Sequence, residues 1–201
     1  MIRVLIAEDM RLLRDALVLL LRMESDFDVV AELASGVEVL PRARATRPDV
    51  AVLDIGLPGV DGISAARALR GAVPQCRTMI LTGLTGPGYL RRAVAANVAG
   101  FMLKTSAPDR FSGAIREIAA GGRVIDPDAA LAVLDDGSRN LTPRELQVLR
   151  HVADGHRVAD VANLLGLSSG TVRNHLNSVV GKVNARNRID AIRIARDGGW
   201  L

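Results

Sequence analysis

Short apolar runs rich in β-branched residues alternate with stretches of helical spacing through the first 120 residues. The apolar runs predict strands at residues 2–7, 29–31, 50–53, 79–81 and 100–103. Between them the spacing predicts helices at residues 12–23, in a stretch that ends at 45, and at 63–71, 87–97 and 107–120. Five successive strand–helix units indicate a doubly wound α/β fold, in which a five-stranded parallel sheet is covered on both faces. Because Pro41 lacks an N–H, we expect it to kink or delay the second helix.

The alternation stops after Gly121 and Gly122. Residues 122–139 mix proline, glycine and acidic residues around a short apolar segment at 129–134, which indicates a linker with one helical piece. From residue 141 to the end the spacing is helical. We therefore predict an α/β domain at residues 1–121, a linker at 122–139 and an all-α domain at 140–201.

The all-α domain is predicted to contain four helices, each marked by its end signals. A capping box starts the first helix, where Thr142 caps, Pro143 takes the first helical position and Glu145 lies three residues past the cap. Gly155 ends this helix, and a second helix at residues 158–165 ends at Gly166. The third and fourth helices follow two further capping residues, Ser168 and Asn187.

Composition fits a soluble protein of two small domains. Of the 201 residues, 49% are hydrophobic and 24% are charged, which argues against a disordered or collagen-like chain. The longest apolar run, residues 16–21, is too short to span a bilayer, and the N-terminus has no secretory cleavage site. A single cysteine, Cys76, fits a reducing compartment. We expect a cytoplasmic protein without membrane contact.

Charge is distributed unevenly along the chain. The net charge is +4, yet residues 126–139 carry −3 and residues 140–201 carry +4. A basic C-terminal domain is typical of a protein with a polyanionic partner. The basic residues are almost all arginine, and the only lysines are Lys104 and Lys182.

Five polar residues lie at the predicted strand ends, and the parallel arrangement brings them to one edge of the sheet. They are Glu8, Asp9, Asp54, Thr82 and Lys104. Three close carboxylates repel one another unless a cation neutralises them, and such oxygen ligands favour Mg²⁺. A lysine and a threonine hydroxyl beside them supply the charge compensation and hydrogen bond that a phosphoryl group on a carboxylate requires. The pattern therefore predicts a site for aspartyl phosphate with Mg²⁺ as cofactor.

Two enzyme classes compete with this interpretation. Phosphatases and phosphotransferases that use an aspartyl intermediate usually have a second acid two residues after the nucleophile, and that position is Gly56. Ser64 and Ser106 have no nearby histidine in the sequence, so a hydrolase triad has no support. We expect a stoichiometric switch and not an enzyme.

These residues resemble the receiver domain of bacterial two-component response regulators. The resemblance covers about residues 1–120 and rests on Glu8-Asp9, the segment D54-I-G-L-P-G-V-D-G62, Thr82 and Lys104. It implies a flavodoxin-like (CheY-like) fold in which Asp54 is the phosphoacceptor. It also implies that Mg²⁺ is held by Glu8, Asp9, Asp54 and the backbone carbonyl of Gly56, and that Thr82 and Lys104 contact the phosphoryl group.

The resemblance implies two further features. Phe101, three residues before the lysine, would be the aromatic residue whose rotamer reports phosphorylation, and the less favoured alternative is an ordinary core residue. Thr105 replaces the proline that follows the lysine in many receivers. Helix-turn-helix regulators often lack that proline, so this departure carries little weight.

The third helix of the C-terminal domain is amphipathic. Its predicted buried stripe consists of Val172, Leu176, Val179 and Val183. The opposite face presents side chains that are able to contact bases or phosphates, namely Arg173, Asn174, Asn177 and Ser178, together with Gly170. With the preceding short helix and turn, this indicates a helix-turn-helix. On pattern alone, a solvated face of a helical bundle is an equal alternative.

Residues 140–201 resemble the LuxR-type helix-turn-helix of the NarL/FixJ subfamily. The resemblance rests on L141-T-P-R-E-L-Q-V-L149, V158-A-D-V-A162, S168-S-G-T-V-R-N-H175, K182-V183 and the final G199-W200. It implies base contacts by Arg173, Asn174 and Asn177, and phosphate contacts by Thr171, Lys182 and Arg188. His156, Arg157 and Val158 depart from the polar residues usual at the start of the second helix, so the resemblance implies no phosphate contact there.

Together the two resemblances imply a transcriptional response regulator. A partner sensor histidine kinase would phosphorylate Asp54, and a homodimer would then bind promoter DNA. The first helix is more apolar than one buried stripe needs, so Val18 or Leu19 is expected on an exposed face that pairs with a partner subunit or docks the kinase. An equal alternative is that this helix is wedged deeply between the sheet and its neighbours. The alternative is an atypical regulator controlled by a ligand or by constitutive dimerisation, and the intact acidic site argues against it.

Overall fold

A computed structural model describes residues 1–84, 86–135, 141–183 and 185–201. The chain forms two compact units, one of residues 1–85 and 90–130 and one of residues 86–89 and 131–201. Part of the predicted linker, 136–139, and the predicted start of the all-α domain at residue 140 lie outside the described residues. Within the described ranges, no helix has the length and apolar character needed to cross a bilayer.

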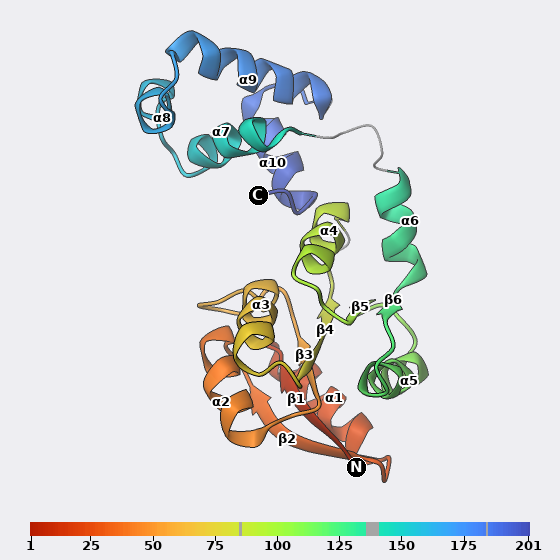
Figure 1. Ribbon diagram of the computed structural model, residues 1–201. Coiled ribbons are helices and arrows are strands. Elements are labelled where there is room, and N and C mark those ends of the chain that lie inside the picture. Colours follow the sequence, from red (N-terminus) through yellow and green to blue (C-terminus); the bar gives the residue numbers. More distant parts are fainter. Residues whose placement is uncertain (85, 136–140, 184) are drawn as a thin grey trace. The chain divides into compact units, whose positions relative to one another are not determined.

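The first unit is built on a six-stranded parallel sheet with the order β2-β1-β3-β4-β5-β6 (Figure 1). Its strands are β1 (Ile2–Ala7), β2 (Phe27–Leu33), β3 (Val50–Leu53), β4 (Arg77–Thr82), β5 (Gly100–Leu103) and β6 (Val124–Ile125). The predicted parallel doubly wound sheet is confirmed, with one strand more than expected. This sixth strand has only two residues and pairs with β5 at the start of the predicted linker.

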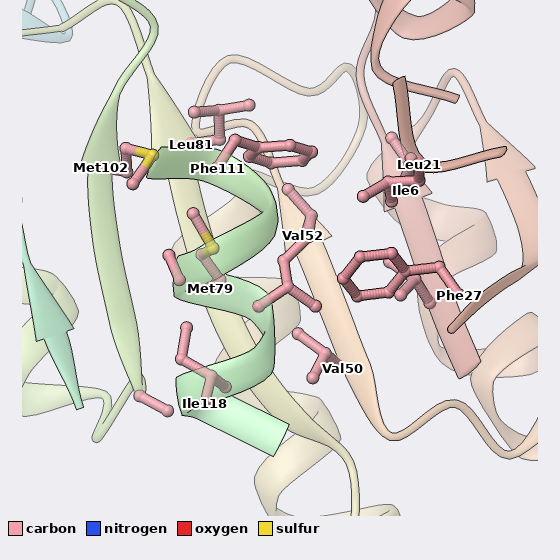
Figure 2. Packing of buried hydrophobic residues seen from close by; sticks show 14 of the residues in the cluster. Ile6, Leu21, Phe27, Val50, Val52, Met79, Leu81, Met102, Phe111 and Ile118 are labelled. Carbon is pink, nitrogen blue, oxygen red and sulfur yellow. The ribbon is translucent and has the colours of Figure 1, made fainter. Parts of the chain in front are cut away.

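Helices cover both faces of this sheet. They are α1 (Arg11–Arg22), α2 (Val39–Thr46), α3 (Gly62–Ala72), α4 (Pro87–Ala95) and α5 (Pro108–Ala119). A further helix, α6 (Pro127–Asp135), follows β6. Because successive strand residues point to opposite faces, alternate residues of each strand reach one helix layer. Figure 2 shows Phe111 and Ile118 of α5 beside Val52 and Met79 of the central strands, in a core that α1 also joins. This packing holds the strand ends in place.

Pro41 does not break the second helix. A 3₁₀ turn, η1 (Gly36–Glu38), precedes α2, which begins at Val39, so that the proline lies in the first helical turn. Backbone N–H groups in the first turn have no acceptor within the helix, and a proline there removes no hydrogen bond. The helix starts late in its predicted stretch, as the proline suggested.

The second unit contains α7 (Pro143–Ala153), α8 (Val158–Leu165), α9 (Ser169–Lys182) and α10 (Arg188–Asp197). The capping box forms as predicted, since the Thr142 hydroxyl accepts from the Glu145 N–H and the Glu145 carboxylate accepts from the Thr142 N–H. The side chains of Ser168 and Asn187 cap α9 and α10. All four helices contribute to one core, which consists of Val148, Leu149, Val161, Ala162, Val172, Leu176, Val179, Val183, Ala191 and Ala195.

Candidate functional site

The sheet order places a crevice where its acidic residues lie. The chain passes from β1 to β2 on one side and then to β3 on the other, and the crevice at such a switch point opens at the carboxyl ends of the strands. Glu8 and Asp9 directly follow β1, and Asp54 directly follows β3. One ligand atom from each of the three carboxylates lies within 4.8 Å of the others. The structure therefore brings the three predicted acids together.

Lys104, the residue after β5, reaches into this group of acids. Its Nζ atom lies 2.8 Å from Oε2 of Glu8 and 3.1 Å from Oδ1 of Asp54. Glu8 and Asp54 are buried, whereas Asp9 is exposed. The ammonium group of Lys104 thus forms ion pairs with two buried carboxylates, and the site keeps an excess of negative charge.

The pKa values reflect this imbalance. Burial, with a smaller contribution from the charge of Asp54, raises the pKa of Glu8, and the hydrogen bond from Lys104 only partly opposes the rise. Burial alone would lower the pKa of Lys104, but its hydrogen bond to Glu8 and the charge of Asp54 raise it. The lysine is held as a cation, while the acids remain short of positive charge. Carboxylate oxygens in this arrangement are ligands that suit a divalent cation.

Gly56 and Thr82 border the acids. The Gly56 N–H donates to Oδ2 of Asp54 over 3.0 Å, and a Cβ at this position would lie 3.1 Å from the same oxygen. Thr82 is the buried last residue of β4, its carbonyl accepts from the Lys104 N–H over 2.9 Å, and its hydroxyl accepts from the Leu84 N–H. Both residues therefore lie along the edge where the carboxylates meet.

Phe101 lies inside β5 and is almost fully buried. Its position is that of a core residue three positions before Lys104. The structure describes one conformation of this ring, and its proposed response to phosphorylation stays a prediction.

The sequence analysis missed a contact that joins this edge to α6. Ser106 donates from its hydroxyl to Oδ2 of the buried Asp126 over 2.6 Å. The other oxygen of Asp126 accepts from the Asp128 N–H over 3.0 Å, at the first turn of α6. The loop that carries Lys104 is thereby connected to the start of the helix that leaves the sheet. The only feature of the sequence that could have indicated this contact is the position of Asp126 directly before Pro127, shortly before a predicted helical piece.

The second unit presents a polar helix face. Val172, Leu176, Val179 and Val183 of the α9 region are buried, as predicted. On the opposite side, exposed side chains gather on one helix face, namely Arg173, Asn174, Asn177 and Ser178. Arg188, at the start of α10, is exposed as well. The Thr171 hydroxyl is hydrogen-bonded to that of Ser168 over 2.9 Å, next to the N-cap of α9.

Lys182, one of the predicted phosphate contacts, has a partner within the unit. Its Nζ atom lies 2.8 Å from Oε2 of Glu145, whose Oε1 accepts from the Ser178 hydroxyl over 2.6 Å. Burial of the Glu145 carboxylate would raise its pKa, but the hydrogen bonds from Lys182, Ser178 and Thr142 lower the pKa to about 2. The contact joins α7 to α9 and was missed because the two residues are 37 positions apart.

Comparison with known proteins assigns both units. Residues 4–116 match the response regulator receiver domain, and residues 139–195 match the luxR family of bacterial regulatory proteins. The chain belongs to the LuxR-type response regulators. The transcriptional regulatory protein DesR of Bacillus subtilis (strain 168) is 38% identical to it over 201 residues, which are 100% of both chains.

Two solved structures resemble the regulator along its whole length. The response regulator ChrA of a heme-sensing two-component system has 30% identity and a TM-score of 0.61, with coverage of 100% of this chain and 98% of that one. A structure of two RcsB dimers bound to two parallel DNAs has 22% identity and a TM-score of 0.74, with 98% of both chains covered, and shares the fold. The regulator is therefore a DNA-binding transcriptional regulator of the two-component type.

Proposed function

We propose that Asp54 of this regulator accepts a phosphoryl group from a partner sensor histidine kinase and that phosphorylation controls promoter binding. The observation that carries the proposal is the single Lys104 ammonium group that contacts both Glu8 and Asp54, beside a third carboxylate. An Asp54 carboxylate oxygen attacks phosphorus, and a P–O bond forms as the P–N bond of a phosphohistidine breaks. The phosphohistidine ring carries a proton on its other nitrogen, so it takes the bonding electron pair and leaves as neutral imidazole. Lys104 and the Thr82 hydroxyl then contact the transferred group, and Phe101 changes its rotamer in response.

Mg²⁺ is the cofactor that this set of donors fits. Glu8, Asp9 and Asp54 offer carboxylate oxygens within 4.8 Å of one another, and the Gly56 carbonyl would complete the protein ligands. When bound, the ion supplies positive charge to the carboxylates and to the phosphoryl oxygens. Lys104 keeps its own role as the cation that contacts Glu8 and Asp54.

Intact-mass measurement after incubation with acetyl phosphate and Mg²⁺ tests the phosphoacceptor. The wild type should gain one phosphoryl group, and Asp54→Asn should gain none. Asp61→Asn is the matched control, because Asp61 lies in the same loop and caps α3 with its side chain, a role that asparagine also fills. A second modification, or labelling of Asp54→Asn, contradicts the proposal.

We further propose that α9 reads promoter DNA, with Arg173, Asn174 and Asn177 at base edges and with Thr171, Lys182 and Arg188 at phosphates. The exposed polar face of α9 and the basic character of residues 140–201 support it. Arg173→Ala or Asn174→Ala should weaken binding to the specific site by about 1–3 kcal/mol and relax base preference there. Lys182→Ala should weaken specific and non-specific binding alike and lower the salt slope by about one unit.

Footprint titrations at several salt concentrations separate these outcomes. Arg67→Ala is the matched control, since it removes the same charge from an exposed position of α3 in the first unit. If Arg173→Ala and Asn174→Ala both behave like this control, α9 is not the recognition helix.

Dimerisation on phosphorylation is the remaining part of the proposal. On α1, Val18 is buried but Leu19 is 62% exposed, and Leu12, two helical turns earlier on the same face, is 84% exposed. Dimers of RcsB, whose fold this chain shares, are bound to DNA in their structure. Sedimentation should show a doubled mass in beryllofluoride for the wild type and no change for Leu19→Glu. An unchanged wild-type mass contradicts phosphorylation-driven dimerisation.

We also propose that residues 1–121 and 140–201 are the two functional domains, joined by the linker at 122–139. As a regulator that acts on promoter DNA, the protein would work in the cytoplasm as a switch rather than as an enzyme. Limited proteolysis should cut first between residues 122 and 139. A first cut inside either proposed domain contradicts these boundaries.

A further inference from the structure

The end of α7 brings together two of the three histidines of the chain. Gly155, with φ of 91°, donates its N–H to the Val152 carbonyl over 3.1 Å, and His156 donates its N–H to the His151 carbonyl over 3.1 Å. These two bonds define a Schellman motif with Asp154 at the C-cap. The residue after the glycine is thereby folded back onto the last helical turn.

Apolar residues usually meet at this point of a Schellman motif. Here the two side chains are imidazoles, with ring centroids 5.5 Å apart and planes at 89°. One ligand atom from each of His151, Asp154 and His156 lies within 4.8 Å of the others. His151 is half-buried and the other two are exposed, so an ion reaches them directly from solvent.

The hydrogen bonding also suits a ligand. Nδ1 of His156 lies 3.0 Å from the His151 carbonyl. An Nδ1–H donor to a backbone carbonyl orients the ring and leaves the Nε2 lone pair free, as in most histidines that bind metals. The C-terminal end of α7 carries partial negative charge, and the Asp154 carboxylate adds a full one. Both favour a cation at this position.

We propose that His151, Asp154 and His156 form a binding site for a divalent transition metal ion of the Zn²⁺ type. Two imidazoles and one carboxylate are ligands that Zn²⁺ takes, with solvent in the remaining position. Ligand atoms around a tetrahedral Zn²⁺ ion lie roughly 3.4 Å apart, so rotations of these accessible side chains complete the site. The ion ties the turn to α7 directly before α8, and it thereby stabilises the helical unit.

Calorimetric titration with ZnCl₂ tests the site, in the full chain without a polyhistidine tag, stripped of metal and kept in excess Mg²⁺. We expect one equivalent of Zn²⁺ to bind and the thermal midpoint of the helical unit to rise. His151→Gln and His156→Gln should each lower the affinity at least about tenfold. His175→Gln on α9, outside the cluster, should bind as the wild type does.

Asp54→Asn provides the second control, because it alters the carboxylates of the first unit and leaves the histidines intact. Zinc binding that survives this change and fails in the histidine variants supports the site, whatever the outcome of the phosphorylation test. Without metal, the urea unfolding midpoint should be the same for the wild type and the variants. If a histidine variant does not fold, Asp154→Asn is used in its place. Absence of binding, equal affinity in the histidine variants, or a loss confined to Asp54→Asn overturns the proposal.

Discussion

The two lysines of the chain each contact a buried glutamate, yet the two pairs behave in opposite ways. In the receiver, Lys104 lies 2.8 Å from Glu8, and the pKa of Glu8 is raised by burial. In the helical unit, Lys182 lies 2.8 Å from Glu145, whose pKa is lowered to about 2 because the hydrogen bonds it accepts outweigh burial. The same pair of groups at the same distance therefore gives opposite shifts.

Burial is the largest influence on the pKa of both glutamates and raises it, and the hydrogen bonds and charges around each one decide the net direction. Glu8 shares its lysine with Asp54, a second carboxylate, and Asp9 lies close by. Glu145 shares its lysine with no other acid among the described contacts, and its oxygens also accept hydrogen bonds from Ser178 and Thr142. An excess of carboxylates favours a cation and a phosphoryl group, whereas an excess of donors favours a structural contact.

The largest expected effect is the loss of stability of the helical unit in acid. A carboxyl group whose pKa is lowered on folding stabilises the protein above its unfolded pKa, near 4.5, and this stability is lost as the pH falls toward about 2. For Glu145 the shift corresponds to about 3 kcal/mol. Urea unfolding from pH 7 to pH 2 should show this loss in the wild type and a smaller one in Glu145→Gln. Equal pH dependence in the two proteins would contradict the assignment.

The second-largest expected effect is the loss of stability when Glu145 is replaced at neutral pH. Glu145→Gln leaves Lys182 without its anion but keeps an acceptor for Ser178, so the helical unit should lose about 2 kcal/mol of unfolding free energy. Glu38→Gln, at an exposed position, is the control and should change little. An unchanged unfolding free energy in Glu145→Gln would show that the Lys182–Glu145 ion pair contributes no more than an ordinary surface contact.

The matching substitution in the receiver should act on ligand binding. Glu8→Gln removes one of three carboxylates and should lower Mg²⁺ affinity by at least about tenfold, with a matching loss of phosphorylation by acetyl phosphate at limiting Mg²⁺. Calorimetry with Mg²⁺ measures the first effect and intact mass the second. Unchanged Mg²⁺ affinity would place the ion elsewhere.

The smallest expected effect is the change in unfolding free energy caused by Glu8→Gln, and its sign should be opposite to that of Glu145→Gln. Without Mg²⁺, Glu8→Gln removes a buried charge that folding disfavours, so the receiver should be unchanged or more stable by up to about 1 kcal/mol. Glu145→Gln lowers stability under the same conditions. Urea unfolding followed separately for each unit by NMR compares the two variants. A clear loss of receiver stability in Glu8→Gln would contradict the predicted difference between the two glutamates.

Sequence patterns predicted the local elements and the site edge well. Helix α8 spans residues 158–165 as predicted, because Gly166 provides an end signal in the chain itself. Glu8, Asp9, Asp54 and Lys104 meet because residues after parallel strands share one edge, which alternation alone implies. The helix end depends on neighbouring residues and the meeting of the acids depends on topology, so both could be predicted from the sequence.

Contacts between distant side chains were not predictable in this way. The two residues of β6 carry no periodic signal and become a strand only by pairing with β5. Lys182 lies on α9 among exposed residues, and its ion pair with Glu145 depends on how α7 packs against that helix. The link from Ser106 to Asp126 likewise depends on the position of α6. These features follow from packing, which the patterns do not encode.

The contrast between the two glutamates is tested most directly by an NMR titration of the side-chain carboxyl carbons in the full chain without Mg²⁺. Glu8→Gln and Glu145→Gln assign the two signals. The pKa of Glu8 should lie above 4.5 and that of Glu145 at about 2. Equal pKa values, or the reverse order, would contradict the proposal that one lysine–glutamate pair belongs to a cation and phosphoryl site and the other is a structural contact.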